Sequence, residues 1–135
     1  MGVCAFVASG LDFDVDEYLR DSPFKPVSVF EKGSVPAKDN PERRPRPDSG
    51  FLVLVSQDEE PHLINQTRDA LEFLAYHRLD IQALKEDGVD NLLLDFGITQ
   101  QHVIKRPQYL PPELIEAMST LTMGIIFSVI EVPEG

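Results

Sequence analysis

Long apolar runs separated by short polar segments divide the chain into alternating strands and helices. The longest run, at 123–132, is broken only by Ser128 and Glu131 and is rich in β-branched residues. Such a run is typical of a strand that is buried on both faces, or of one that faces a core on one side and a partner on the other. We predict a central or near-central strand here, around which the sheet is built.

Other apolar or alternating segments also have the composition of strands. The segment CAFVA at 4–8 ends at Ser9 and Gly10, and Phe51 leads another apolar run. The segment 25–32 alternates in character and ends at Gly33. The predicted strands are 4–8, 25–32, 51–56, 91–98 and 123–132, with a further short strand near 102–105.

Helical spacing of apolar residues and capping residues predict four helices between these strands. Asp14 is expected to cap the first helix, with Glu17 as its capping-box partner and Phe13 and Tyr18 in contact across the cap. Gly88 stands where a left-handed residue would end the third helix. The predicted helices are 15–21, 61 to about 77, 81–87 with Asp80 as its cap, and 113–121.

The order of the elements indicates the fold class. Strand–helix–strand is followed by strand–helix–helix–strand and then by helix–strand. Strands joined by helices in this way predict an α+β protein with a single sheet of about four to six strands and helices packed mainly on one face. The first five elements alone could form a ferredoxin-like arrangement. We expect one domain over 1–135.

A segment of different composition interrupts this order at about 34–49. It is rich in proline and arginine and has little to bury, so it predicts an irregular loop. A basic loop on an acidic body could bind an anion, fold back onto the acidic surface, or simply be solvated. The candidate anion-binding residues are Lys38, Arg43, Arg44 and Arg46.

The formal net charge of −11 changes the choice of partners. It disfavours nucleic acid and anionic membranes, because binding either depends on neutralising phosphates. It favours a basic protein partner, or serves solubility alone. No segment has the length of a membrane helix and the N-terminus lacks the basic region of a signal peptide, so we expect a cytoplasmic protein. The candidate partner-binding residues are Asp14, Asp16, Glu17, Asp58, Glu59 and Glu60.

The acids at the first helix have a spacing that suggests calcium. Asp12, Asp14 and Asp16 match the start of an EF-hand loop. Glu17 stands where that loop needs glycine, and Pro23 stands where it needs a bidentate glutamate. Acids in a first helical turn are explained by the helix dipole, so we predict no metal site.

The residues needed for nucleophilic catalysis are sparse. Cys4, the single cysteine, lies inside an apolar strand, where a thiol is expected to be inert packing. His62 and His77 are placed near opposite ends of one helix, about 22 Å apart, too far to share a metal. Asp95 is either an outward-facing residue or a buried acid with a raised pKa. We therefore predict no enzyme, no catalytic residues and no cofactor.

Several short motifs follow one family. Gly10, Phe13, Asp14, Tyr18 and Leu19 form the pattern Gly-x-x-Phe-Asp-x-x-x-Tyr-Leu after the first strand. Further shared features are Lys32 and Gly33 at a strand end, an aromatic residue at position 51, Pro112, Glu113 and Leu114 at a helix start, and Leu121 and Gly124 at a turn. The chain resembles a small bacterial family catalogued as a domain of unknown function, number four-two-seven-nine.

This resemblance covers nearly the whole chain, with two departures. Phe51 stands where the family has Trp, and the loop at 34–49 is long. The family brings no catalytic residues. Some of its members resemble immunity proteins of bacterial toxin systems, so the resemblance implies a partner-binding, toxin-neutralising role. The alternative is a small-molecule-sensing or enzymatic domain whose site the sequence does not show.

Overall fold

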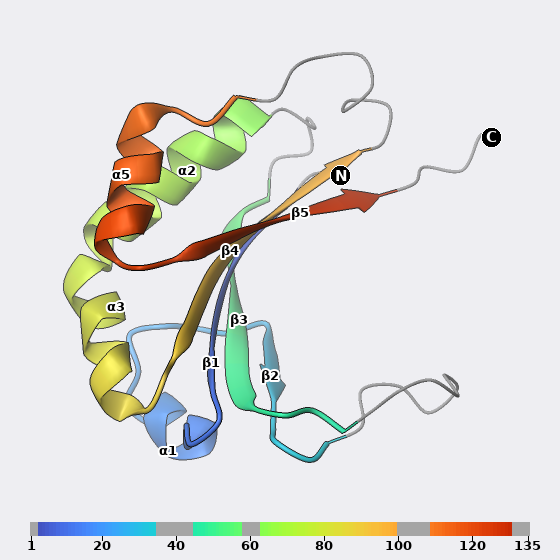
Figure 1. Cartoon of the computed structure of the whole chain (residues 1–135), viewed down its shortest axis with the longest axis vertical. Helices are drawn as coiled ribbons and strands as arrows, with labels where there is room; N and C mark the ends of the chain where they lie inside the picture. The colour runs from blue at the N-terminus through green and yellow to red at the C-terminus, as the bar shows by residue number, and fades with distance from the viewer. Residues whose placement is uncertain (1–2, 35–44, 58–62, 100–108, 131–135) are drawn as a thin grey trace.

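The computed structural model describes residues 3–34, 45–57, 63–99 and 109–130 (Figure 1). Its strands form one five-stranded sheet, and α2, α3 and α5 stack along one face of it. The elements are β1 (Cys4–Gly10), α1 (Val15–Leu19), β2 (Ser28–Phe30), β3 (Ser49–Ser56), α2 (Leu63–Tyr76), α3 (Arg78–Leu84), the short 3-10 helix η1 (Lys85–Asp87), β4 (Asn91–Thr99), α5 (Pro112–Thr120) and β5 (Gly124–Ile130).

The strand order is β2-β3-β1-β4-β5, which confirms the predicted α+β class with a single sheet. The pairs β2–β3, β3–β1 and β1–β4 are antiparallel, whereas β4 and β5 run parallel. Order and direction over β1 to β4 are those of the split βαββαβ unit of ferredoxin-like folds. Helix α5 then supplies the crossover that a parallel neighbour requires, and β5 extends the sheet.

The centre of the sheet is β1. Every residue of it is buried except the half-buried Val7. Cys4, Phe6 and Ala8 face the helices, and the Phe6 ring lies between 5.4 and 6.3 Å from three other phenylalanine rings, at positions 24, 51 and 73. These rings fill the space between β1, β3 and α2, and the core continues over β4 towards α3 and α5.

The prediction of a central or near-central strand at 123–132 is wrong. Strand β5 lies at the edge of the sheet and pairs only with β4 among the described strands. Ile126 and Phe127 are each 41% exposed, and Val129 is 53% exposed. A strand that is buried on both faces and a strand that has one face on the core and one on a partner have the same apolar sequence pattern. The pattern therefore does not show where the strand lies within the sheet.

The predicted start of α1 is confirmed. The Glu17 backbone N–H donates to the Asp14 carboxylate at 3.2 Å, and the rings of Phe13 and Tyr18 lie 5.5 Å apart. The helix ends at Leu19, two residues before the predicted end. The cap thus satisfies a backbone donor that a free helix end leaves without a partner.

The predicted end of the α3–η1 segment is also confirmed, but its start is not. Gly88 has φ of +98°, and the Val89 N–H donates to the Leu84 carbonyl at 3.2 Å, as in a Schellman motif. The predicted cap at Asp80 is wrong, because α3 begins at Arg78 and Asp80 lies inside it. The Asp80 carboxylate instead pairs with His77 Nδ1 at 3.0 Å, which ties this side chain back to the helix start.

Strand β2 is shorter than the predicted 25–32. Its regular pairing covers Ser28–Phe30, and the Val27 N–H adds a bond of 2.9 Å to the Leu52 carbonyl. Pairing stops there because Pro26 has no N–H to donate. The predicted helix start at 61 and the predicted strand at 102–105 lie outside the described residues.

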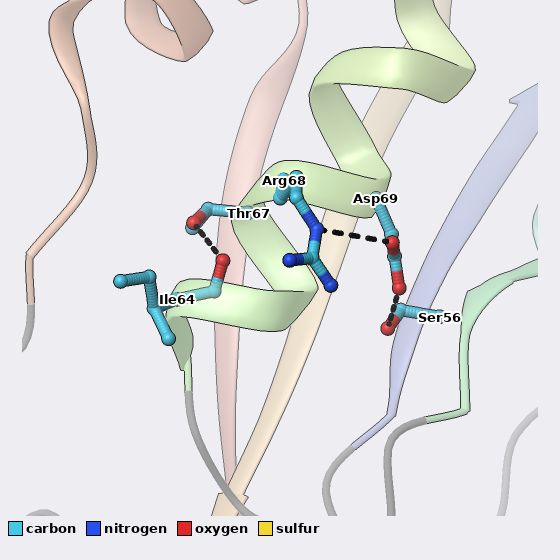
Figure 2. Close-up of polar contacts among 5 residues, drawn as sticks. All are labelled: Ser56, Ile64, Thr67, Arg68 and Asp69. Carbon is cyan, nitrogen blue, oxygen red and sulfur yellow. Dashed lines mark hydrogen bonds and ion pairs between the residues drawn. The ribbon is translucent and has the colours of Figure 1, made fainter.

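Polar contacts hold α2 in place on the sheet. The Ser56 hydroxyl at the end of β3 donates to the Asp69 carboxylate at 2.7 Å, as Figure 2 shows. Arg68 Nε lies 4.0 Å from the same carboxylate, and the Thr67 hydroxyl donates to the Ile64 carbonyl within the helix. Because Ser56 is buried and Asp69 is not fully exposed, this bond fixes the rotation of α2 more firmly than the exposed ion pair does.

Candidate partner-binding surface

Exposed acids gather at the end of the sheet where α1 lies. They come from three segments that are far apart in the sequence: the loop and first turn of α1, the residue after β2, and η1. We call this set the acidic α1 surface, and its members are Asp12, Asp14, Asp16, Glu17, Glu31 and Asp87. All six are exposed.

Close backbone packing brings two of these segments together. A Cβ placed on Gly10 would lie 2.0 Å from the Gly88 carbonyl oxygen, and one placed on Gly88 would lie 3.0 Å from the Asp12 carbonyl oxygen. The loop before α1 and the turn after η1 therefore touch backbone to backbone. Two glycines allow this approach, and it puts the acids of both segments on one surface.

The centre of this surface is the pair Asp16 and Glu31. A hydrogen bond to Asp16, and then the charge of Asp16, raise the pKa of Glu31 above its ordinary value. Slight desolvation and the charge of Asp14 act in the same direction. Like charges therefore crowd one another here, although the site is open to solvent.

Helix α1 is anchored beneath its acids by aromatic packing. The rings of Tyr18 and Phe51 stack at 5.7 Å with an interplanar angle of 12°. Burial raises the pKa of Tyr18, and a hydrogen bond with Ser22 partly offsets this shift. The charges of Asp80 and Asp87 raise the same pKa further, so α3 and η1 add to the negative potential around α1.

No lysine, arginine or histidine among the described residues forms an ion pair with a member of this surface. Within residues 3–34, 45–57, 63–99 and 109–130, the ion pairs are Arg68 with Asp69 and His77 with Asp80. Neither includes a member of the acidic α1 surface. In the same part of the chain, no group of three or more histidine, cysteine or acidic side chains is arranged to hold a metal ion. Within the described residues, therefore, no ion pair neutralises these six acids.

The structure brings some of the predicted residues together. Asp14, Asp16 and Glu17 share one exposed helix turn, although the Asp14 carboxylate is also used as the helix cap. The candidates at 58–60 lie outside the described residues. The sequence did not reveal Glu31 and Asp87 as neighbours of this turn, because only strand pairing and the contact between Gly10 and Gly88 bring them there.

The candidate anion loop is described only at its base. Lys38, Arg43 and Arg44 lie outside the described residues. The backbone of Arg46 exchanges bonds of 2.8 Å with Gly33 and Ser34, which closes the base of the loop. The Arg46 guanidinium lies 4.6 Å from the centre of the Phe30 ring, a cation–π contact that the sequence pattern did not indicate.

The potential nucleophiles are engaged in folding contacts. Burial raises the pKa of the Cys4 thiol far above its ordinary value, and the charges of Asp95 and Asp69 add to the shift. The Ser128 hydroxyl donates to the Asp95 carboxylate at 2.7 Å, and Asp95 is half-buried on the sheet face away from the helices. Among the described residues, no serine or cysteine is hydrogen-bonded to His77, whose ring packs 4.7 Å from that of Phe73.

Two cavities lie around α5. One of about 540 Å³ separates α5 from the start of β5 and is lined by apolar side chains such as Met118 and Ile125. The other, of about 320 Å³, separates α2 from α5, and charged residues including Arg78 and Glu113 line it. Both are open grooves on the helix-covered side of the protein.

Comparison with known proteins identifies no relative of this chain. No family model matches it. No curated protein and no solved structure match it either. The resemblance to the bacterial family of unknown function stays a prediction. None of the described helices is both long and apolar enough to span a membrane.

Proposed function

We propose that this chain is a non-enzymatic protein of the bacterial cytoplasm that binds a basic protein partner through the acidic α1 surface. The observation that supports this proposal is the crowding of Asp16 and Glu31, with no described cation paired to either. Neutralisation of a basic toxin, as in immunity proteins, is the form of the function that we favour.

The negative charge of this surface favours binding of a cationic partner. Acids that crowd one another are held at a cost in the free protein, and a lysine or arginine placed between them removes that cost. A concentration of one charge sign also steers an oppositely charged partner and raises its association rate. Both effects act in addition to the net charge of −11 that the whole chain carries.

Rigid support makes the surface suitable for recognition. Helix α1 is fixed by the Asp14 cap and by the stack of Tyr18 on Phe51. Glu31 follows a strand, and Asp87 precedes the left-handed Gly88. A surface that is already arranged loses little conformational entropy when a partner binds.

The alternative function is small-molecule binding. The groove of about 320 Å³ between α2 and α5 is where such a ligand would fit, because Arg78 and Glu113 offer both charge signs above an apolar floor. A ligand in this groove would not depend on the acids of α1, so the two functions are separable by mutation.

Two matched variants of the whole chain test the proposal. Asp14→Asn, Asp16→Asn and Glu31→Gln together remove the centre of the acidic α1 surface, and asparagine keeps the helix cap. The control carries Glu72→Gln, Glu113→Gln and Glu116→Gln on exposed positions of α2 and α5. Each variant has a net charge of −11 + 3 = −8.

Wild type and both variants are used as baits in lysate of the source organism, and the captured proteins are identified by mass spectrometry. We expect a basic protein with the wild type and with the control, but not with the α1 variant. With the purified partner, the α1 variant should associate about tenfold more slowly at low salt, and the difference should shrink as salt rises.

Other results would contradict the proposal. Equal loss of the partner from both variants would mean that only net charge matters. Loss from the control alone would favour the groove between α2 and α5. An immunity role further requires that the partner is toxic when expressed alone and harmless when expressed with this chain.

A further inference from the structure

The outer edge of β5 is apolar and carries no charge. The strand reads GIIFSVI, and Ile125, Ile126, Phe127 and Val129 are between 38% and 53% exposed. Among the described strands only β4 pairs with it, so alternate backbone N–H and carbonyl groups point away from the sheet. Natural proteins usually protect such an edge with lysine, proline, a bulge or a very short strand, and β5 has none of these.

The opposite edge of the same sheet is protected in the usual way. Strand β2 has only three residues, Ser28–Phe30. Pro26 precedes it, and Lys25 and Lys32 flank it. The contrast between the two edges indicates that the outer edge of β5 accepts a further strand and that the outer edge of β2 does not.

We propose that β5 pairs in antiparallel fashion with β5 of a second copy of this chain, with a two-fold axis at Phe127. In this register Phe127 meets its own copy, Ile125 meets Val129, and Ile126 meets Ser128. Residues directly opposite one another share a face of the sheet, so apolar side chains meet apolar side chains on the helix-covered face. Two five-stranded sheets then become one continuous sheet.

The chemistry of the edge favours a second copy as the occupant. A partner strand for this edge should be apolar and uncharged, because a charge facing Ile125 or Phe127 would lose its water. The β5 strand meets this requirement itself, and its sequence fits its own reverse about Phe127. Closed two-fold dimers are also the commonest assembly of soluble proteins.

The acids of the acidic α1 surface do not oppose this pairing at close range. Helix α1 packs against β3 and lies at the far end of the molecule from β5 (Figure 1). At 0.1 M salt, repulsion between exposed charges is screened over about 10 Å. The dimer goes beyond the proposed function, since it leaves the acidic α1 surface open on both copies.

Sedimentation equilibrium of the full chain is the first test. We expect a mass that rises with protein concentration from 15.2 kDa towards twice that value. Added salt should strengthen the association, because it screens the repulsion between two chains of charge −11. Binding of a basic partner should respond to salt in the opposite direction, so failure of one proposal is distinct from failure of the other. A mass of 15.2 kDa at every concentration and salt level would overturn the dimer.

Charge substitutions then test the register. Ile125→Lys places an ammonium group opposite Val129 and should weaken self-association at least about tenfold. Adding Val129→Glu to this variant places opposite charges across both symmetric pairs and should restore most of the association. The matched double variant I125K/V129K should stay monomeric. The control Val29→Lys, on the β2 edge, should dimerise as the wild type does.

Circular dichroism checks that each variant is folded, and V129K alone serves as the substitute if I125K is not. Hydrogen exchange adds a second readout, since amides of Gly124–Ile130 should be better protected at high than at low protein concentration. An I125K protein as dimeric as the wild type, or an I125K/V129E protein no better associated than I125K/V129K, would overturn the pairing.

Discussion

Asp16 raises the pKa of Glu31, both through a hydrogen bond that forms when one of the two carboxyl groups is protonated and through its own negative charge. Asp16 lies in the first turn of α1 and Glu31 follows β2, so the contact joins two separate elements. Two neighbouring carboxylates repel each other, and protonation of one of them removes this repulsion. At a pH between the ordinary and the raised pKa, Glu31 should therefore hold a proton in the folded protein more often than in the unfolded chain.

The first prediction concerns the pH dependence of this pair. Because the pKa of Glu31 is raised in the folded state, repulsion between Glu31 and Asp16 destabilises the fold at neutral pH. This destabilisation is lost as Glu31 is protonated, which happens as the pH falls through the raised pKa to below the ordinary value of 4.5. Glu31→Gln removes the repulsion, so this variant should melt at a higher temperature than the wild type at pH 7. The difference should shrink to near zero below pH 4.5.

The matched control is Glu113→Gln on α5, which removes one charge far from this pair. It reports the general benefit of lowering the net charge of −11. Equal gains from both variants at pH 7 would mean that Asp16 and Glu31 do not interact specifically.

The second prediction concerns the attachment of α2 to the sheet. Ser56→Ala removes the donor that the Asp69 carboxylate accepts at 2.7 Å, and should cost about 1–2 kcal/mol in the free energy of unfolding. Ser56→Thr keeps the hydroxyl and should recover part of the loss. Arg68→Ala should cost less than about 0.5 kcal/mol, because its 4.0 Å contact is exposed. Urea unfolding of the three variants measures all of these values, and a larger loss for R68A than for S56A would reverse our ranking.

The third prediction separates the edge strand from the core. The rings of Phe96 and Phe127 stack at 5.9 Å across β4 and β5, but Phe96 is fully buried and Phe127 is 41% exposed. Phe96→Ala should cost about 3–5 kcal/mol and Phe127→Ala only about 1–2 kcal/mol, since part of its ring already meets water. Unfolding by urea at low protein concentration measures both. Equal costs would place Phe127 in the core after all.

This pair of residues also shows what the sequence could predict. Both lie in apolar runs, so the presence and length of β4 and β5 follow from composition and from nearby glycines. The same is true of the Asp14 cap and of the left-handed Gly88, which are local features. The position of a strand within the sheet depends on contacts between distant segments, and β1 is central because it pairs with β3 on one side and with β4 on the other.

The candidate site divides in the same way. Asp14, Asp16 and Glu17 could be predicted as exposed acids, because they occupy the first turn of a capped helix. Glu31 and Asp87 could not, since their approach to this turn depends on the β2–β3 hairpin and on the packing of Gly10 against Gly88. Sequence periodicity holds no information about such long-range contacts.

The last prediction links the contact between Gly10 and Gly88 to the acidic α1 surface. Gly10→Ala would place a methyl group 2.0 Å from the Gly88 carbonyl oxygen, so one backbone segment must move. We expect a loss of about 3 kcal/mol in the free energy of unfolding. The shift should also separate Asp12 from η1 and change amide chemical shifts from Gly10 through α1 as well as at Gly88.

The control is Gly33→Ala, where φ is +88° and nothing lies within 4 Å of the added carbon. That variant should cost only about 1–2 kcal/mol for the left-handed backbone and should leave the amides of α1 unchanged. If G10A costs no more than G33A and leaves the α1 amides in place, the two loops are not held together by this contact, and Asp87 does not belong to the acidic α1 surface.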